Sequence, residues 1–194
     1  MERNSRNSQG YKLESQIREA YGRVTYSQTC HDKFINRTVK LDEAIKVCQI
    51  VLSGITTSGF VVAIFSNDKI ASIIGVVVSL ALLILNTYTK NFNLSGIAQE
   101  HKKASDLLWK IREEYVSLLT DYEMLSVEEI RNKRDELQDR TAEIYSNSPR
   151  TDAKSYQAAQ KALKTEEEQT FSEEEIDIML PNSVRRCNRE MLDN

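Results

Sequence analysis

The stretch VCQIVLSGITTSGFVVAIFSNDKIASIIGVVVSLALLILNTY, residues 47 to 88, concentrates the apolar side chains of this chain. It contains two runs of nineteen residues without a charge, 47–65 and 70–88, separated by Ser66-Asn67-Asp68-Lys69. A bilayer's hydrocarbon is ~30 Å thick and a helix rises ~1.5 Å per residue, so roughly 20 helical residues cross it. The stretch therefore predicts a hairpin of two transmembrane helices joined by a tight turn.

The two runs differ in how apolar they are. The second, from Ile70 to Tyr88, carries aliphatic side chains on every face. The first is diluted by five polar residues, Gln49, Ser53, Thr56, Thr57 and Ser58. Each polar group in lipid needs a partner within the protein or a wet surface. The alternative is a soluble bundle with both runs in its core, since a buried core helix is also apolar all round.

The sequence outside these runs is strongly polar. The 194 residues include 26 Lys+Arg and 29 Asp+Glu, for a net charge of -3. Binding to nucleic acid is therefore not expected, because it needs a strongly basic domain. Cys30, Cys48 and Cys187 are odd in number and far apart, which indicates free thiols in a reducing compartment rather than a disulfide framework.

The positive charges nearest the runs predict the orientation. Only Lys69 lies in the turn, whereas seven basic residues flank the hairpin, namely Lys33, Arg37, Lys40, Lys46, Lys90, Lys102 and Lys103. Because positive charges stay on the cytoplasmic side, both termini are expected there. The polar first 40 residues and the second run that follows the first argue against a signal peptide.

These observations predict an all-α protein with a two-span transmembrane helical hairpin and a cytosolic helical bundle built from both tails. Its expected parts are an amino-terminal amphipathic cytosolic helix, residues 1–46, then the hairpin, 47–88, and carboxy-terminal cytosolic helices with an acidic tail, 89–194.

The segment before the hairpin has the period of an amphipathic helix. Between residues 11 and 45, spacings of three and four place one stripe on a single face: Ile17, Tyr21, Val24, Gln28, His31 and Ile35. A second stripe, Phe34, Leu41, Ile45 and Cys48, continues into the first run. The amino-terminal helix is therefore expected to join the first span with little or no break.

A second periodic segment follows the hairpin. Its seam alternates spacings of four and three, through Ile97, His101, Ala104, Leu108, Ile111, Tyr115, Leu118 and Tyr122. Tyr and His are poor residues for a dimeric zipper, so the seam is expected to pack on other tail helices, within the chain or across subunits.

Capping signals divide the remainder. Ser126 and Glu129 form a capping box that opens a helix to about Tyr145, and a short helix is expected over 151–164. Ser172 and Glu175 form a second capping box in an acidic segment that Pro181 ends. Four residues there are candidates for docking a partner, namely Phe171, Glu173, Glu174 and Glu175. The other interpretation of this segment is a solvated tail.

Enzyme signatures are not found in the sequence. His31 and His101 both fall on helix seams, where a buried packing histidine is expected over a general base. No spacing makes a zinc set, and no phosphate loop, nucleophile elbow or dinucleotide fingerprint occurs. We expect no catalytic residue, no metal site and no cofactor.

Polar residues inside the two runs have a helical spacing. Gln49, Ser53 and Thr56 follow Lys46 on one helical face, and three polar residues of the second run lie seven apart, Ser72, Ser79 and Asn86. Small and hydroxylated residues serve close packing between membrane helices, which is one explanation. The other is that several hairpins assemble with one stripe lining a water-filled path. Two spans do not enclose a pore, so this second explanation requires a homo-oligomer, held together at the seam from Ile97 to Tyr122.

The layout resembles the SLATT domain, the two-transmembrane effectors associated with bacterial nucleotide-signalling defence systems. The resemblance covers roughly residues 11 to 181 and rests on the order of the helices and on two local stretches. These are Ser148-Pro149-Arg150-Thr151 before the short helix, and the acidic turn Phe171-Ser172-Glu173-Glu174-Glu175-Ile176-Asp177-Ile178-Met179-Leu180-Pro181.

The resemblance implies an effector of antiviral defence that opens a pore in, or disrupts, the bacterial inner membrane. The sensor would be a separate protein. The effector would respond to a nucleotide second messenger or to an associated enzyme, such as a nucleotidyltransferase or reverse transcriptase. Membrane lipid and further copies of the chain are then the expected partners, and the family supplies no catalytic residues. The rival hypothesis is a passive anchor or scaffold that recruits a partner through its cytosolic helices and acidic tail.

Overall fold

The computed structural model describes residues 2–66 and 69–185, and all of its regular elements within those ranges are helices. In chain order they are α1 (Glu2–Ser66), α2 (Lys69–Asn91), α3 (Leu94–Thr120), α4 (Val127–Asn147), α5 (Ala153–Lys164), α6 (Glu173–Met179) and the 3-10 turn η1 (Asn182–Val184). The predicted all-α class is confirmed.

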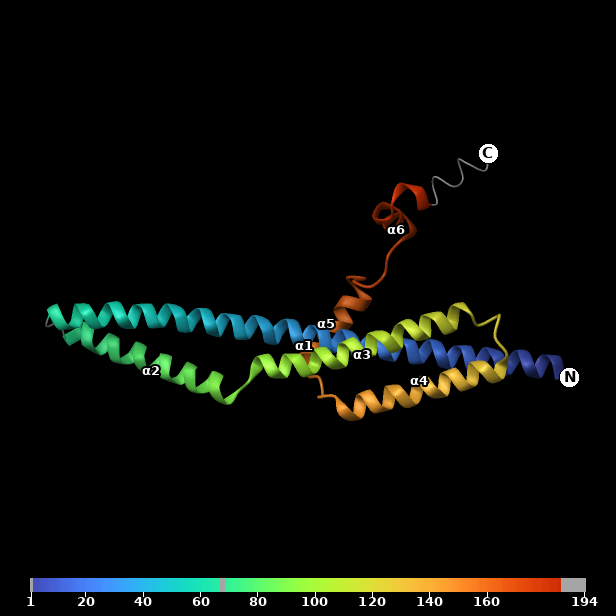
Figure 1. The fold of residues 1–194 in the computed structure, drawn as a ribbon, viewed down its shortest axis with the longest axis horizontal. Coiled ribbons are helices and arrows are strands. Elements are labelled where there is room, and N and C mark those ends of the chain that lie inside the picture. The colour runs from blue at the N-terminus through green and yellow to red at the C-terminus, as the bar shows by residue number, and fades with distance from the viewer. Residues whose placement is uncertain (1, 67–68, 186–194) are drawn as a thin grey trace.

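α1 is a single helix of 65 residues that runs along almost the whole molecule (Figure 1). At ~1.5 Å per residue it extends roughly 100 Å. The two prolines of the chain, Pro149 and Pro181, lie outside it, so every interior N–H of α1 is able to hydrogen-bond along the helix. The expected continuity between the amino-terminal helix and the first apolar run is confirmed.

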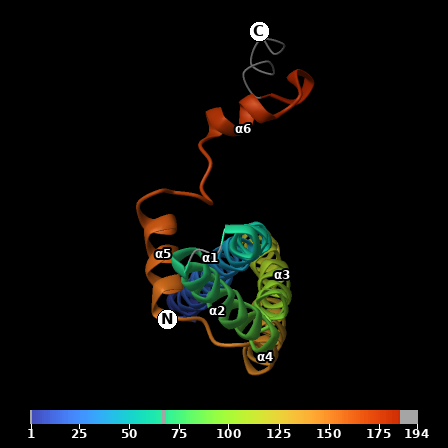
Figure 2. The same cartoon turned by 90° about the vertical axis from the view of Figure 1, so that its left-hand side faces the viewer.

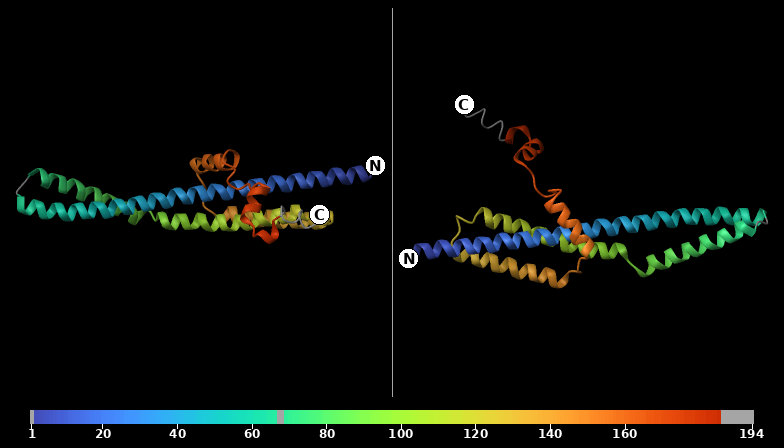
Figure 3. Two further views of the ribbon diagram at one scale, coloured as in Figure 1. Left: turned by 90° about the horizontal axis from the view of Figure 1, so that it is seen from above. Right: turned by 180° about the vertical axis from the view of Figure 1, so that it is seen from behind.

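α2 folds back beside the far half of α1 and forms a hairpin with it (Figures 1 and 3). Among the described residues, one helical stretch is long and apolar enough to cross a membrane. It begins at Ser72 in α2, and none of its apolar window is buried within the molecule.

The chain leaves helical geometry at Phe92 and Asn93, between α2 and α3. The Asn93 side chain accepts a hydrogen bond of 2.9 Å from the Gly96 N–H and so caps α3. A Cβ at Gly96 would lie 2.4 Å from the side-chain Nδ2 of Asn93, so a larger residue there would require the Asn93 side chain to shift. Within α3, Ala98 is 6% exposed and Ile97 is 40% exposed. The buried face of α3 therefore begins at Ala98 within the chain, and a place for Ile97 in a seam between copies stays a prediction.

α3 returns along the first half of α1, and α4 packs back along α3 (Figures 1 and 2). Their shared core consists of Leu13, Ile17, Ala20 and Val24 of α1, Leu108, Ile111, Tyr115 and Leu118 of α3, and Ile130 and Leu137 of α4. Both capping boxes form as predicted, at Ser126 with Glu129 and at Ser172 with Glu175. The amphipathic stripe of α1 and the seam of α3 thus meet within one chain.

α5 lies on the side of α1 away from α3 (Figure 2). It packs through small side chains, because Ser155, Ala159 and Ala162 are at most 1% exposed. α6 stands apart from the bundle and has no buried residue (Figures 1 and 3).

The core contact of α3 with α1 yields a stability test on two neighbouring leucines. Leu108 is fully buried, whereas Leu107 is 45% exposed. We expect Leu108→Ala to lower the free energy of unfolding by about 2–5 kcal/mol, through lost burial and the cavity left behind. Leu107→Ala is the matched control and should stay within about 0.5 kcal/mol of the wild type. Melting curves followed by circular dichroism in detergent measure both, and equal effects would contradict this core.

Candidate functional site: polar contacts of the hairpin and a clasp on its long helix

A polar contact ties the two arms of the hairpin together. The Gln49 Nε2 donates hydrogen bonds to Asn86 Oδ1 at 2.9 Å and to Thr89 Oγ1 at 3.1 Å. The structure thereby brings together two of the six predicted pore-lining residues, Gln49 and Asn86, within a single chain. This is how polar groups of adjacent membrane helices satisfy each other.

The other four pore-lining candidates do not join that contact. Thr56 Oγ1 donates to the Leu52 carbonyl of its own helix at 2.8 Å. Ser53, Ser72 and Ser79 are exposed on the outside of the single hairpin. A neighbouring hairpin or water can therefore reach all three of these serines.

Two buried histidines meet where α1 and α3 pack near the hairpin. His31 is 4% and His101 2% exposed, and their Nδ1 atoms lie 3.0 Å apart. Such a contact needs one Nδ1–H donor and one bare Nδ1 acceptor, so it fits two neutral rings. The Phe34 ring stacks on His101 with 3.8 Å between ring centroids, and the Arg37 guanidinium lies 5.3 Å from the Phe34 centroid.

Burial keeps both imidazoles neutral. Desolvation, with repulsion from His101, lowers the pKa of His31 to about 4. Burial also lowers the pKa of His101, against the attraction of the Asp152 carboxylate. Beside the pair, Ser105 Oγ donates a 2.5 Å hydrogen bond to Asp32 Oδ1, and burial raises the pKa of that carboxyl. The prediction that the histidines are buried packing residues is confirmed, but their mutual contact was not predicted. Among the described residues, no cluster of three or more metal-ligating side chains occurs.

A clasp, defined here as residues 152 to 169, packs on α1, with α5 on the side of α1 away from α3 (Figure 2). At its first end, Arg37 of α1 donates to both carboxylate oxygens of Asp152. Asp152 also caps α5 by accepting a 2.8 Å hydrogen bond from the Ser155 N–H. The Arg37 guanidinium holds the pKa of Asp152 well below its usual range. One carboxylate thus starts α5 and fixes it to α1.

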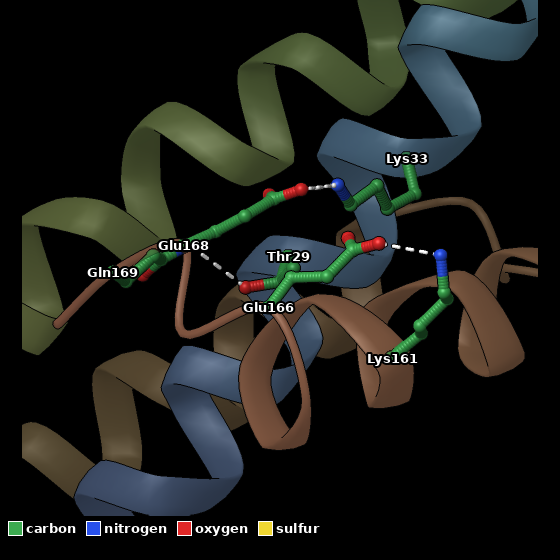
Figure 4. A network of polar contacts seen from close by, with 6 residues as sticks. All are labelled: Thr29, Lys33, Lys161, Glu166, Glu168 and Gln169. Atoms are coloured by element: carbon green, nitrogen blue, oxygen red, sulfur yellow. Dashed lines mark hydrogen bonds and ion pairs between the residues drawn. The ribbon is translucent and has the colours of Figure 1, made fainter.

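The second end of the clasp is the segment after α5, which bends back across α1 (Figure 4). Lys33 Nζ lies 2.6 and 2.7 Å from the two carboxylate oxygens of Glu168. Gln169 Nε2 donates to Thr29 Oγ1 at 3.0 Å, and Arg112 of α3 donates to the side-chain oxygen Oε1 of Gln169. Glu167 has a φ of 50°, an unusual conformation for a residue with a Cβ, which turns the chain into this contact.

Sequence reasoning missed the clasp. Lys33 and Arg37 were interpreted only as charges that set membrane orientation, and Glu168 only as part of an acidic run. The one local signal is Asp152 three residues before Ser155, which is typical of a helix N-cap. Its pairing with Arg37 joins residues 115 positions apart, which spacing does not predict.

Most of the predicted seam residues pack in the core of the single chain. His101, Leu108, Ile111, Tyr115 and Leu118 are all buried. Tyr122 is partly buried, and its hydroxyl donates to the Gly10 carbonyl at 2.7 Å. In contrast, the docking candidates Phe171, Glu173, Glu174 and Glu175 are exposed.

The histidine contact generates a prediction about pH. Because the folded-state pKa of His31 is about 4, the unfolded chain binds more protons than the folded one between about pH 6.5 and 4. The stabilising effect of the neutral pair is therefore complete above about pH 6.5 and is lost as the pH falls toward 4. Melting temperatures over this range should drop more steeply for the wild type than for the variant with both His31→Gln and His101→Gln. If the melting temperatures of the two proteins fall with pH at the same rate, the assignment of a buried neutral histidine pair is contradicted.

Comparison with known proteins identifies the chain. Residues 13–175 match the model of the SMODS and SLOG-associating 2TM effector domain family 4, and the chain belongs to that family. The resemblance to the SLATT domain is thereby confirmed, and the family is described as one of effector domains. No curated protein and no solved structure gives a significant match.

Proposed function

We propose that this member of the two-transmembrane effector family is a pore-forming effector of bacterial antiviral defence, which assembles from several copies in the inner membrane. Both termini would lie in the cytosol. The observation that carries the proposal is the continuity of α1, which is both the central helix of the bundle and one arm of the hairpin. Any movement of α1 in the bundle is transmitted to the membrane without an intervening joint.

The exposed surface of the hairpin supports insertion of both arms. On α2, Ile70, Ile73, Val76 and Val77 are each more than 60% exposed, and Ile50 on α1 is 71% exposed. A soluble bundle would bury side chains of this kind, whereas lipid solvates them. The flanking Lys46 and Lys90 suit the cytosolic membrane surface.

A pore would form between hairpins rather than within one. Within the hairpin, Gln49, Asn86 and Thr89 already satisfy one another. The exposed residues Ser53 and Ser79 remain to line a water-filled path when neighbouring copies surround it. The oligomer proposed here accounts for uncharged polar residues on an otherwise lipid-facing surface.

The clasp provides a route for gating. It contacts α1 at Thr29, Lys33 and Arg37. These residues lie next to the histidine pair, in the part of the bundle nearer to the hairpin. A signalling partner that binds the unclasped state more tightly than the clasped state would shift the assembly toward an open pore. The free energy of that shift is limited by the difference between the partner's affinities for the two states. The family's association with SMODS and SLOG signalling proteins supports a separate sensor in this role.

One observation favours the second candidate function, a membrane scaffold. α6 stands free of the bundle and exposes both acidic and apolar side chains. Replacing Glu173, Glu174 and Glu175 together with glutamine distinguishes the two functions. Loss of partner recruitment with unchanged ion flux would support the scaffold.

The proposed pore wall is tested by substituting Ser53. We expect Ser53→Leu to reduce dye leakage from reconstituted liposomes at least tenfold, because an apolar constriction dewets the path (each ~1.4 kcal/mol is about tenfold). Val51→Leu is the matched control on the same helix, where Val51 is 54% exposed and apolar. If Ser53→Leu leaks dye as fast as the wild type, at equal insertion and oligomer size, Ser53 does not line the pore. Gln49→Leu is measured separately, since it also breaks the contact between the arms.

Gating by the clasp is tested through its ion pair. Lys33→Glu places a carboxylate against Glu168, so it should open the clasp and raise leakage in the absence of any trigger. Adding Glu168→Lys restores an opposite pair and should return leakage to the wild-type level. Leakage that is equal in the wild type, the single variant and the double variant would rule out this route.

A further inference from the structure

Two exposed surfaces of opposite charge lie on consecutive helices, α5 and α6, and do not contact each other (Figures 1 and 2). The first is the lysine face of α5, consisting of Lys154, Gln157, Lys161 and Lys164. These residues follow at i, i+3, i+7 and i+10, which is one side of a helix, and all four are exposed. α5 contains no acidic residue, and its opposite side, Ser155, Ala159 and Ala162, is buried against α1.

The second surface is α6. It carries Glu173, Glu174, Glu175 and Asp177 and no basic residue. Glu174 lies one turn before Ile178, and Glu175 one turn before Met179, so acidic and apolar side chains share a face. Ile178 is 73% and Met179 63% exposed.

α6 is capped at both ends although none of its residues is buried within the part of the chain that the structure describes. Its capping box satisfies the first N–H groups, and the Arg185 guanidinium donates to the carbonyls of Leu180 and Ile178. Seven residues are far fewer than a helix needs to be stable alone in water. A short helix that is capped but unpacked is suited to bind another surface.

The clasp keeps α6 away from the lysine face of its own chain. Glu168 and Gln169 are fixed to α1 and α3, so only Thr170, Phe171 and Ser172 separate this anchor from α6. From there α6 points away from α5 and from the rest of the bundle (Figures 1 and 2).

We propose that α6 of one copy packs along the lysine face of α5 of a second copy. This inference rests on the proposed function, because it names a contact by which the copies of the effector hold each other. The carboxylates of α6 would face the three ammonium groups, while Ile178 and Met179 would cover Tyr156, which is 53% exposed, and the lysine stems. Every chain carries one α6 and one lysine face. Two chains can therefore exchange α6 helices and form a symmetric dimer, or each chain can bind the next and close a ring.

The ion pair between Lys161 and Glu166 must exchange for this contact to form. Lys161 Nζ lies 2.5 Å from Glu166 of its own chain, with side chains 68% and 40% exposed (Figure 4). Pairs this exposed contribute little, so replacing Glu166 by a carboxylate of the second copy costs little. Because the contact is mostly between exposed charges, it should weaken as salt is raised.

Charge reversal in full-length protein tests the contact. Variant A carries Glu173→Lys, Glu174→Lys and Asp177→Lys, which leaves the capping box intact. Variant B carries Lys154→Glu, Lys161→Glu and Lys164→Glu. Each variant alone opposes like charges, whereas in a mixture the reversed α6 of A meets the reversed α5 of B and the two native surfaces also meet.

We therefore expect neither variant to co-purify with differently tagged copies of itself in detergent, and a mixture of A with B to recover the wild-type yield. Lys12→Glu together with Glu128→Lys, exposed positions on α1 and α4, is the control and should self-associate normally. Self-association of A and B alone at the wild-type level, or no recovery in the mixture, would overturn the inference. Loss of binding of B to anionic vesicles with unchanged self-association would reassign the lysine face to lipid and would also overturn it.

A cross-link checks the same contact without charge changes. In chains with Cys48→Ser and Cys187→Ser, Ile178→Cys on one copy should form a disulfide with Gln157→Cys on a differently tagged copy when a thiol oxidant is added to accept the two electrons. Absence of this product, or equal yield of Ile178→Cys homodimers, would contradict the contact. Leakage measured on the same samples distinguishes the proposed pore from the proposed contact between copies. Leakage without the cross-link would contradict only the contact between α6 and α5, and the cross-link without leakage would contradict only the pore.

Discussion

The unbroken backbone of α1 is the constraint on which the other contacts depend. One helix carries an amphipathic stripe through its first half and an apolar surface through its second, with no proline to interrupt it. α2, α3 and α5 all pack on α1, so the hairpin, the bundle and the clasp share one rod. The structure therefore couples the proposed membrane segment to the bundle by backbone hydrogen bonds rather than by side-chain contacts alone.

The interior of the bundle changes character along this rod. Far from the hairpin, α1 buries Leu13, Ile17, Ala20 and Val24. Toward the hairpin, the buried residues of α1 are mostly polar, with Gln28, Thr29, His31 and Thr38 beside the apolar Cys30. There, Thr25 Oγ1 and Ser155 Oγ are buried without a hydrogen-bond partner among the described residues, which costs free energy. The apolar end forms the hydrophobic core of the bundle, and the polar end is where the clasp contacts α1.

Local features were predictable because their causes lie within a few residues. The helices follow from apolar spacing, and the caps at Ser126 and Ser172 from a hydroxyl three residues before a glutamate. Burial of His31 and His101 also followed from their place on a stripe, but their contact joins positions 70 residues apart. Spacing allows either Ile97 or Ala98 to precede His101 on the seam, since they lie four and three residues before it, and the structure buries Ala98. The pairing of Gln49 with Asn86 depends on the register of the hairpin, which composition does not specify.

Single-channel recording across a planar bilayer tests the central claim most directly, with the wild type compared to the clasp-opening variant Lys33→Glu. The account predicts discrete current steps of one recurring size in both proteins, with a higher open fraction in the variant. Silence from both proteins, when proteolysis and labelling show that they are inserted as oligomers, would contradict a pore and leave the hairpin as an anchor.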